Sequence, residues 1–336
     1  MNIERIIIGG YNVIVHSECG DCLEIFMQKD FCLYPKSADK DINIYSFIKH
    51  GVVKHITEDS KKIRHESFNV YISHRKGGSE GLIIEKLNHG NICSYIIIAE
   101  DVNSQIVLLR SVLIKIFFQA NVLCGAFPIH CSSISHKDSG YLFIADSNGG
   151  KSTIYFSFAS YSDAAAYALM SDDTILCRFE DNQIIGSVMP LKPSLRKGTL
   201  NYVPQTECFA NQFDIGYDMD DQIYVDVSKL KNSKMVLQNK IKAAFFINFS
   251  DIFCIKKIQD LQMLKERIAM IVCGYKATPI DERFLNFINN ITNRVKFYNI
   301  FIPPNMKEFY DKFDAWLENG EESSHEENNK KQLENA

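Results

Sequence analysis

Residues 145–153 have the sequence Ala145-Asp146-Ser147-Asn148-Gly149-Gly150-Lys151-Ser152-Thr153. This is the spacing of a phosphate-binding loop, GxxxxGK[ST], with alanine in place of the first glycine. The apolar residues 141–144 predict a buried strand before the loop, and residues 151–160 predict a helix after it. The stretch therefore predicts a nucleotide-binding site in a domain that combines strands and helices, and the alternative is a glycine-rich turn without a ligand.

Each residue type in this loop suits a bound phosphate. Backbone N–H groups turn inward, and the helix that follows directs its positive end at the same point. Gly149 and Gly150 let the backbone approach phosphate oxygens without an intervening side chain. Asn148 is among the few non-glycine residues that tolerate a positive φ angle. We expect Lys151 to contact the β- and γ-phosphates of ATP, and the Ser152 hydroxyl to bind Mg²⁺.

Two carboxylates follow the next apolar stretch, residues 167–170. They are Asp172 and Asp173, directly after Ser171. A carboxylate at the end of a buried strand is where a phosphate-loop enzyme holds its metal ion or a water of that ion. The second carboxylate can accept the proton of an attacking hydroxyl group. Without the loop, the same residues would predict only a turn.

His130 lies at the start of a strand predicted for residues 130–135. A turn at residues 137–140 connects this strand to the one that enters the loop. Most histidines in a chain are surface residues or satisfied core residues, and this chain has nine. Neighbouring strands of one sheet would nevertheless bring His130 beside the loop, so it is a candidate catalytic residue.

The remaining pattern predicts an α+β or α/β protein with two domains and a tail. Short Ile-, Val-, Tyr- and Phe-rich runs predict a β-rich domain over residues 1–103, with strands at 5–15, 42–48, 69–73, 81–84 and 94–99. Residues 104–318 form the second domain. It begins with a connecting helix at 104–122, continues with strands at 175–179, 184–188, 243–249 and 295–302, and contains helices at 261–273, 282–291 and 305–317. The polar, acidic residues 319–336 predict a disordered tail.

Composition excludes several other classes of protein. The 336 residues carry a net charge of −4, which argues against a general nucleic-acid binder. The longest apolar stretch, 106–118, contains Arg110 and Lys115, so we expect no membrane span. The N-terminus lacks the apolar core of a signal peptide, which favours the cytoplasm.

Ten cysteines are scattered along the chain, and we expect them to be reduced. Only Cys19-Gly20-Asp21-Cys22 has the spacing of a metal or redox site. A zinc site would need two more ligands at similar spacing, and the sequence offers none. A turn with two incidental thiols is therefore the favoured interpretation.

His130, the loop and the Asp172-Asp173 pair together resemble the catalytic domain of the HPr kinase/phosphorylase family, over about residues 130–186. The resemblance is closer to the shorter HPr-kinase-like proteins, some of which phosphorylate a serine of a precursor peptide in peptide biosynthesis. It implies a phosphate-loop kinase fold related to phosphoenolpyruvate carboxykinase, with ATP and Mg²⁺ as cofactors. HPr kinases are hexamers, so it also allows a homo-oligomer.

Matched to this chain, the family's histidine is His130 and its phosphate loop is the segment from Ala145 to Ser152. The family implies that Asp172 is the base for the serine hydroxyl, tuned by His130, and that Asp173 is a metal ligand. The chain lacks the glycine- and arginine-rich motif that HPr kinases carry after the acidic pair. Lys192 and Arg196 are the substitutes we consider for a phosphate-facing cation, against the alternative of a solvated basic turn.

The sequence thus favours an ATP-dependent serine kinase that acts on a peptide or small protein. Two other hypotheses remain open: a kinase for a small hydroxylated metabolite, and a nucleotide-sensing regulator without turnover. The β-rich domain is assigned either to substrate selection or to oligomerisation.

Overall fold

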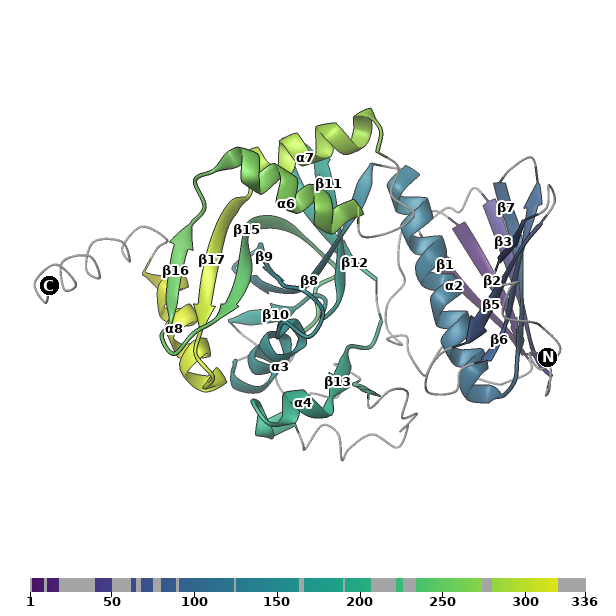
Figure 1. The fold of residues 1–336 in the computed structure, drawn as a ribbon, viewed down its shortest axis with the longest axis horizontal. Coiled ribbons are helices and arrows are strands. Elements are labelled where there is room, and N and C mark those ends of the chain that lie inside the picture. Colours follow the sequence, from purple (N-terminus) through teal and green to yellow (C-terminus); the bar gives the residue numbers. More distant parts are fainter. Residues whose placement is uncertain are drawn as a thin grey trace, which may run out of the picture. The chain divides into compact units, whose positions relative to one another are not determined.

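The computed structural model describes residues 2–8, 11–17, 40–49, 62–64, 68–74, 80–88, 91–123, 125–162, 166–189, 191–206, 222–225, 234–273 and 280–319. These residues form mixed β-sheets with helices packed on them, which is an α+β arrangement (Figure 1). Their contacts divide the chain into two compact units. One consists of residues 1–126, 189–192 and 213–226, and the other of residues 127–188, 193–212 and 227–336.

The first unit contains a seven-stranded sheet with one long helix on it. The strands are β1 (Asn2–Ile8), β2 (Tyr11–Ser17), β3 (Lys40–Ile48), β4 (Lys62–Arg64), β5 (Phe68–His74), β6 (Glu80–Asn88) and β7 (Asn91–Ala99). Their order in the sheet is β1-β2-β3-β7-β6-β5-β4. β3 is parallel to both of its neighbours, and the remaining pairs are antiparallel.

Helix α2 (Val102–Leu123) packs on this sheet against β7, β3, β6 and β1. Leu109, Leu113 and Ile116 are buried, as their helical spacing predicted. Lys115 of α2 forms an ion pair with Glu85 of β6, which is 1% exposed and also accepts a hydrogen bond of 2.9 Å from the Tyr71 hydroxyl. The compact unit that contains this sheet includes α2 and the chain up to Ala126.

The second unit is built on an eight-stranded sheet. Its strands are β8 (Ala126–His136), β9 (Ser139–Ile144), β10 (Tyr167–Leu169), β11 (Thr174–Glu180), β12 (Gln183–Val188), β15 (Gln238–Phe249), β16 (Cys254–Lys257) and β17 (Lys296–Ile302). The order is β10-β8-β11-β12-β15-β17-β16, and β9 pairs with both β8 and β15. β9, β15 and β17 are parallel, so the segments that follow them all begin at one edge of the sheet.

The remaining elements are helices and two short strands. The helices are α3 (Lys151–Tyr161), α4 (Lys197–Leu200), the 3-10 turn η2 (Pro204–Thr206), α6 (Leu261–Cys273), α7 (Glu282–Arg294) and α8 (Met306–Glu318). The two short strands are β13 (Ser194–Arg196) and β14 (Gln222–Tyr224).

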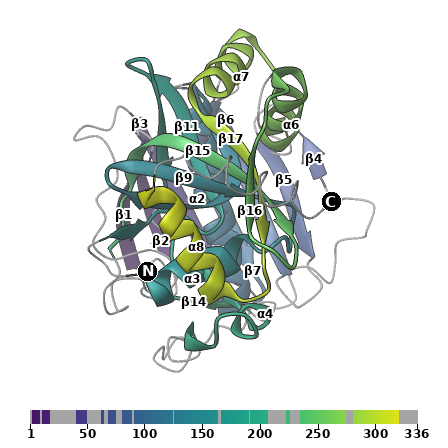
Figure 2. The same ribbon diagram turned by 90° about the vertical axis from the view of Figure 1, so that its left-hand side faces the viewer.

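An aromatic cluster forms the core on one face of this sheet. Its fully buried members are Phe143 of β9, Phe158 of α3, Phe245 of β15, and Phe309 and Phe313 of α8. The ring of Phe313 lies 5.3 Å from those of both Phe143 and Phe245, between centroids. These ring contacts pack α8 on β9 and β15, and α8 also lies against α3 (Figure 2).

Helices α6 and α7 cover the opposite face. Successive residues of a strand point to opposite sides, so Phe246 faces away from the Phe245 cluster. The guanidinium carbon of Arg267 in α6 lies 3.7 Å from the centroid of the Phe246 ring. α7 lies beside α6 (Figure 2) and packs against β11, β12 and β17. The sheet therefore separates an aromatic layer with α3 and α8 from a second layer with α6 and α7.

Local sequence signals explain several boundaries. Asn305 is the N-cap of α8, and its side chain accepts hydrogen bonds from the N–H groups of Lys307 and Glu308. Asp181 and Asn182 have φ angles of 48° and 63°, which suit the short turn between β11 and β12.

Most of the expected strands and helices are present. The helix expected at residues 261–273 has these bounds in the structure, and those expected at 104–122, 151–160, 282–291 and 305–317 differ by a few residues. The run at 5–15 contains two strands rather than one, and β4 was not expected. The Cys19–Cys22 spacing and the tail from residue 320 lie outside the described residues, and Cys131, Cys177 and Cys254 are free thiols. In the part of the chain that the structure describes, no helix has the length and apolar character needed to cross a membrane.

We predict that Phe313→Ala lowers the free energy of unfolding by about 3–5 kcal/mol, because it removes a fully buried ring from the centre of the aromatic cluster. Urea unfolding followed by circular dichroism measures the loss. Leu285→Ala is the control, because this α7 side chain is 56% exposed and its truncation should change stability by less than about 0.5 kcal/mol. Equal losses for the two variants would contradict the assignment of the cluster as the core of this unit.

Candidate active site

The loop between β9 and α3 has the backbone geometry that its sequence predicted. Asn148 and Gly150 have positive φ angles of 62° and 85°. The tolerance of asparagine for this region explains why it can replace a glycine here. A Cβ atom added at Gly149 would lie 2.6 Å from Cβ of Ala145, and one added at Gly150 would lie 2.7 Å from the ring of Phe249. Close packing therefore requires Gly149, and the positive φ angle favours glycine at position 150.

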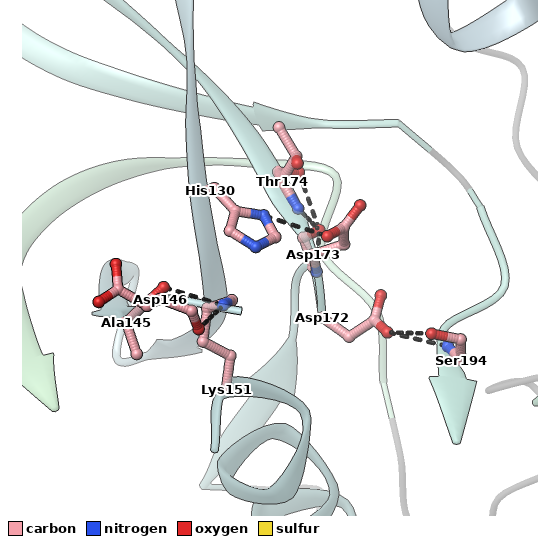
Figure 3. Close-up of polar contacts among 9 residues, drawn as sticks. His130, Ala145, Asp146, Lys151, Asp172, Asp173, Thr174 and Ser194 are labelled. Carbon is pink, nitrogen blue, oxygen red and sulfur yellow. Dashed lines mark hydrogen bonds and ion pairs between the residues drawn. The ribbon is translucent and has the colours of Figure 1, made fainter. Parts of the chain in front are cut away.

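The Lys151 side chain lies against the loop. Its ammonium group donates hydrogen bonds to the carbonyl oxygens of Ala145, at 2.9 Å, and Asp146, at 2.8 Å. The residue is 7% exposed, and burial lowers the pKa of the ammonium group, while the charge of Asp173 opposes this change. Lys151 thus places a positive charge at the centre of the loop (Figure 3).

Main-chain pairing brings the acidic segment alongside β8. The N–H of Cys131 donates to the carbonyl of Asp173 at 2.9 Å, and the N–H of Ser133 donates to that of Ser171 at 2.6 Å. The Ser171 hydroxyl also accepts hydrogen bonds from the N–H groups of Asp173 and Thr174, which fixes the turn after β10. The two aspartates are therefore presented next to the middle of β8, beside His130 and Cys131.

His130 and Asp173 are in contact at the site. Nδ1 of His130 lies 3.2 Å from Oδ1 of Asp173, and both side chains are partly exposed (Figure 3). The carboxylate of Asp172 points the other way and accepts hydrogen bonds from the Ser194 backbone N–H, at 2.8 Å, and hydroxyl, at 3.4 Å. The family resemblance implied that the histidine tunes Asp172, whereas in the structure it contacts Asp173.

These groups line one pocket of about 440 Å³. Its walls include His130, Asp172, Asp173 and the loop from Ser147 to Thr153, and thus Ser152. Ala145 and Asp146 do not line it but line a neighbouring cavity. The pocket combines a positively charged loop, a helix N-terminus and two carboxylates, and this combination can bind a phosphate chain and a hard metal ion.

Of the two cations considered beyond the acidic pair, Arg196 lies at the pocket. Its Nη1 donates a 2.7 Å hydrogen bond to Oδ1 of Asn148 in the loop. Lys192 is buried, does not line the pocket, and belongs to the other compact unit. The pocket is also lined by Ser194, Thr199 and Tyr202, from β13 and the segment after it, and these residues were not predicted from the sequence. No sequence motif includes these residues, because only the tertiary fold brings their segment to the pocket.

The donor set fits Mg²⁺ rather than a metal held by the protein alone. Among the described residues, no group of three or more His, Cys, Asp or Glu side chains could hold a metal ion. Mg²⁺ in nucleotide sites is bound through one or two carboxylates together with the phosphates and water. Ser152, Asp172 and Asp173 offer oxygen ligands of this kind in one pocket.

A thiol nucleophile is not supported at this site. Cys131 follows His130 directly, but the residue is fully buried, and burial raises the pKa of its thiol well above the ordinary value. A protonated, inaccessible thiol is a poor nucleophile. The chemistry of the pocket therefore depends on its carboxylates, histidine and cations.

No protein-family model matches this chain, and no curated protein matches it in sequence. Among solved structures, the Hpr(Ser) kinase/phosphatase from Coxiella burnetii is similar to it, at 15% sequence identity and a TM-score of 0.29. The match covers 57% of this chain and 99% of that chain. Because this TM-score is low, functional conclusions depend on the residues of the site and their geometry.

We predict that Gly149→Ala weakens binding of inorganic pyrophosphate at least about tenfold, because the added methyl group collides with Ala145 and the loop must deform. Isothermal titration calorimetry measures the affinity. Gly198→Ala is the matched control, since Gly198 lines the same pocket but an added Cβ would meet nothing within 4 Å. Equal affinities for the two variants would show that the loop does not bind the phosphates.

Proposed function

We propose that this protein binds Mg-ATP in the pocket at the phosphate loop and transfers the γ-phosphoryl group to a hydroxyl, the serine of a peptide or small protein. The observation that carries the proposal is the His130–Asp173 pair, at 3.2 Å, in the same pocket as Lys151 and the loop. A nucleotide-binding loop alone would support only binding. A proton-accepting pair beside it supports group transfer.

The loop and its cations stabilise the phosphate chain. Phosphoryl transfer requires little covalent chemistry from the protein, so positioning and charge stabilisation supply most of the rate enhancement. Lys151 and the N-terminal end of α3 offset the negative charge of the β- and γ-phosphates. Arg196, held at Asn148, provides a second cation at the loop.

We assign proton acceptance to the pair of His130 and Asp173. A carboxylate beside an imidazole stabilises the cation that forms when the ring accepts a proton, as in other histidine-carboxylate pairs. Asp172 accepts a hydrogen bond from the backbone N–H of Ser194, which orients its carboxylate in the pocket. An ionised carboxylate suits metal binding, so we assign Asp172 and Ser152 to Mg²⁺. When bound, Mg²⁺ would neutralise charge on the β- and γ-phosphate oxygens.

Lys151→Met should abolish ATP binding and transfer, because the methionine side chain fills similar space without the charge. Binding is measured by the shift in melting temperature with Mg-ATP, and transfer by labelled ATP offered with serine peptides, with hydroxylated metabolites, or alone. Circular dichroism checks that the variant is folded. Wild-type protein that does not bind ATP would overturn the proposal, and binding without transfer to any acceptor would indicate a nucleotide sensor instead.

Asp173→Asn should lower the rate of transfer by about 10²–10⁴-fold with ATP affinity unchanged, because it removes the negative charge beside His130. Asp172→Asn, which keeps an oxygen to accept from Ser194, should instead raise the Mg²⁺ concentration needed for half-maximal transfer. Transfer is measured over a titration of Mg²⁺. If Asp172→Asn abolished transfer at saturating Mg²⁺ while Asp173→Asn stayed active, the two roles would be reversed.

A further inference from the structure

A second cavity, of about 850 Å³, lies on the other side of the phosphate loop. Its walls come from the loop residues Ala145 and Asp146, from Phe246 and Phe249 of β15, and from α6. It therefore opens on the face of the sheet that α6 covers. The pocket already described lies instead over the helix end of the loop, where Lys151 and Ser152 lie.

The two cavities differ in the groups that line them. Lys151, Ser152, Asp172, Asp173 and Arg196 line only the first, so the phosphates and the metal ion belong there. The second has Arg267 as its cation and Asp146 on its wall, and most of its other lining residues are apolar. It does not have the loop lysine and helix N-terminus that a triphosphate needs.

His130 lines both cavities, together with Ser147, Gly149 and Phe249. In phosphoryl transfer the attacking and leaving oxygens are roughly in line, so the acceptor approaches the γ-phosphate from the side away from ADP. A hydroxyl group in the second cavity can approach a phosphate in the first beside His130, which lines both and can accept the hydroxyl proton. The second cavity is therefore placed to hold the acceptor.

Arg267 is held in a fixed orientation at this cavity. Its guanidinium group lies over the Phe246 ring, and Nη1 donates to Oδ1 of Asn299 at 3.4 Å. Burial lowers the pKa of the guanidinium group, and the charge of Asp146 on the same wall raises it. An arginine stays charged in proteins and presents five donors in a planar fork that matches a carboxylate. Its stacking on a ring reduces the side-chain entropy lost on binding.

Two large apolar side chains are exposed at the same cavity. Met270 of α6 is 71% exposed, and Phe249 at the end of β15 is 62% exposed. A flexible methionine and an open phenylalanine ring are suited to contact an apolar side chain of a polypeptide. A small, strongly polar metabolite would leave this apolar surface in water.

We propose that the second cavity binds the acceptor, and that the acceptor is a polypeptide segment whose serine is flanked by one carboxylate side chain and one apolar side chain. This inference rests on the proposed function. Arg267 pairs with the carboxylate, and Met270 and Phe249 contact the apolar side chain. The serine oxygen forms a bond to the γ-phosphorus, the bond from that phosphorus to the bridging oxygen of ADP breaks, and the hydroxyl proton passes to the His130–Asp173 pair.

The test uses sets of serine peptides in which one position, within four residues of the serine, is Asp, Asn or Lys. Leucine lies on the other side of the serine, and the peptides of a set are otherwise identical. The wild-type protein should phosphorylate the preferred Asp peptide with kcat/KM at least about tenfold above its Asn counterpart, as for a hydrogen bond to a charged group. Arg267→Gln should remove this preference through KM, and Arg267→Glu should transfer it to the Lys peptide. The KM for ATP should not change in either variant.

Lys265→Gln is the matched control, because Lys265 is a cation on the same helix that does not line the cavity. A second variant, Met270→Lys, changes an exposed residue. It should lower the affinity for the peptides that carry leucine without altering ATP binding. Fluorescence polarisation of the labelled Asp peptide should give a weaker affinity for Arg267→Gln than for the wild type.

The failures of the two proposals are distinguishable. If ATP binding is absent, or transfer survives Lys151→Met, the proposed function fails. If ATP is bound and transferred but Arg267→Gln keeps the preference for Asp, the acceptor assignment alone is overturned. It is also overturned if the wild-type protein binds none of the peptides, or phosphorylates only metabolites.

Discussion

The parallel pairing of β9, β15 and β17 is the constraint on which the candidate site depends. It brings the ends of three strands, which are distant in sequence, to one edge of the sheet. The phosphate loop follows β9, Phe249 ends β15, and Pro304 lies just after β17, and all three contribute to one pocket. The buried aromatic layer beneath α3 and α8 holds the strands in this arrangement, so core and site share the same support.

Local sequence patterns were enough to predict most residues of the candidate site. The loop, its strand and its helix form one contiguous stretch with strong signals, and His130 and the two aspartates lie close to it in sequence. Which of these side chains contact one another was harder to predict from the sequence. The histidine contacts Asp173 rather than Asp172 because the segment after β10 pairs with β8 in one register, and pairing registers are set by tertiary contacts. Ser194 lies 22 residues beyond Asp172 and carries no motif.

The structure also explains why the loop can depart from the usual sequence pattern. Alanine at position 145 replaces a glycine, and its methyl group fills the space that a side chain at 149 would need. Because residue 149 is a glycine, the alanine at 145 fits without changing the shape of the loop. Arg196, reaching Asn148, supplies a cation in a chain that lacks the family's arginine-rich motif. Arg267 could not be recognised from sequence, because it lies on a helix more than 100 residues after the loop and resembles any other surface arginine.

The ion pair between Glu85 and Lys115 has a consequence for the orientation of α2. Ile106, Val107, Leu108 and Leu109 are all buried, so this helix has no single apolar stripe. Apolar burial has no preferred direction, so it contributes little to fixing the exact rotation of the helix about its axis. A buried carboxylate must be paired, and only one rotation brings Lys115 to Glu85. The charge pair thus adds a contact of defined direction to a helix that is otherwise held mainly by apolar burial.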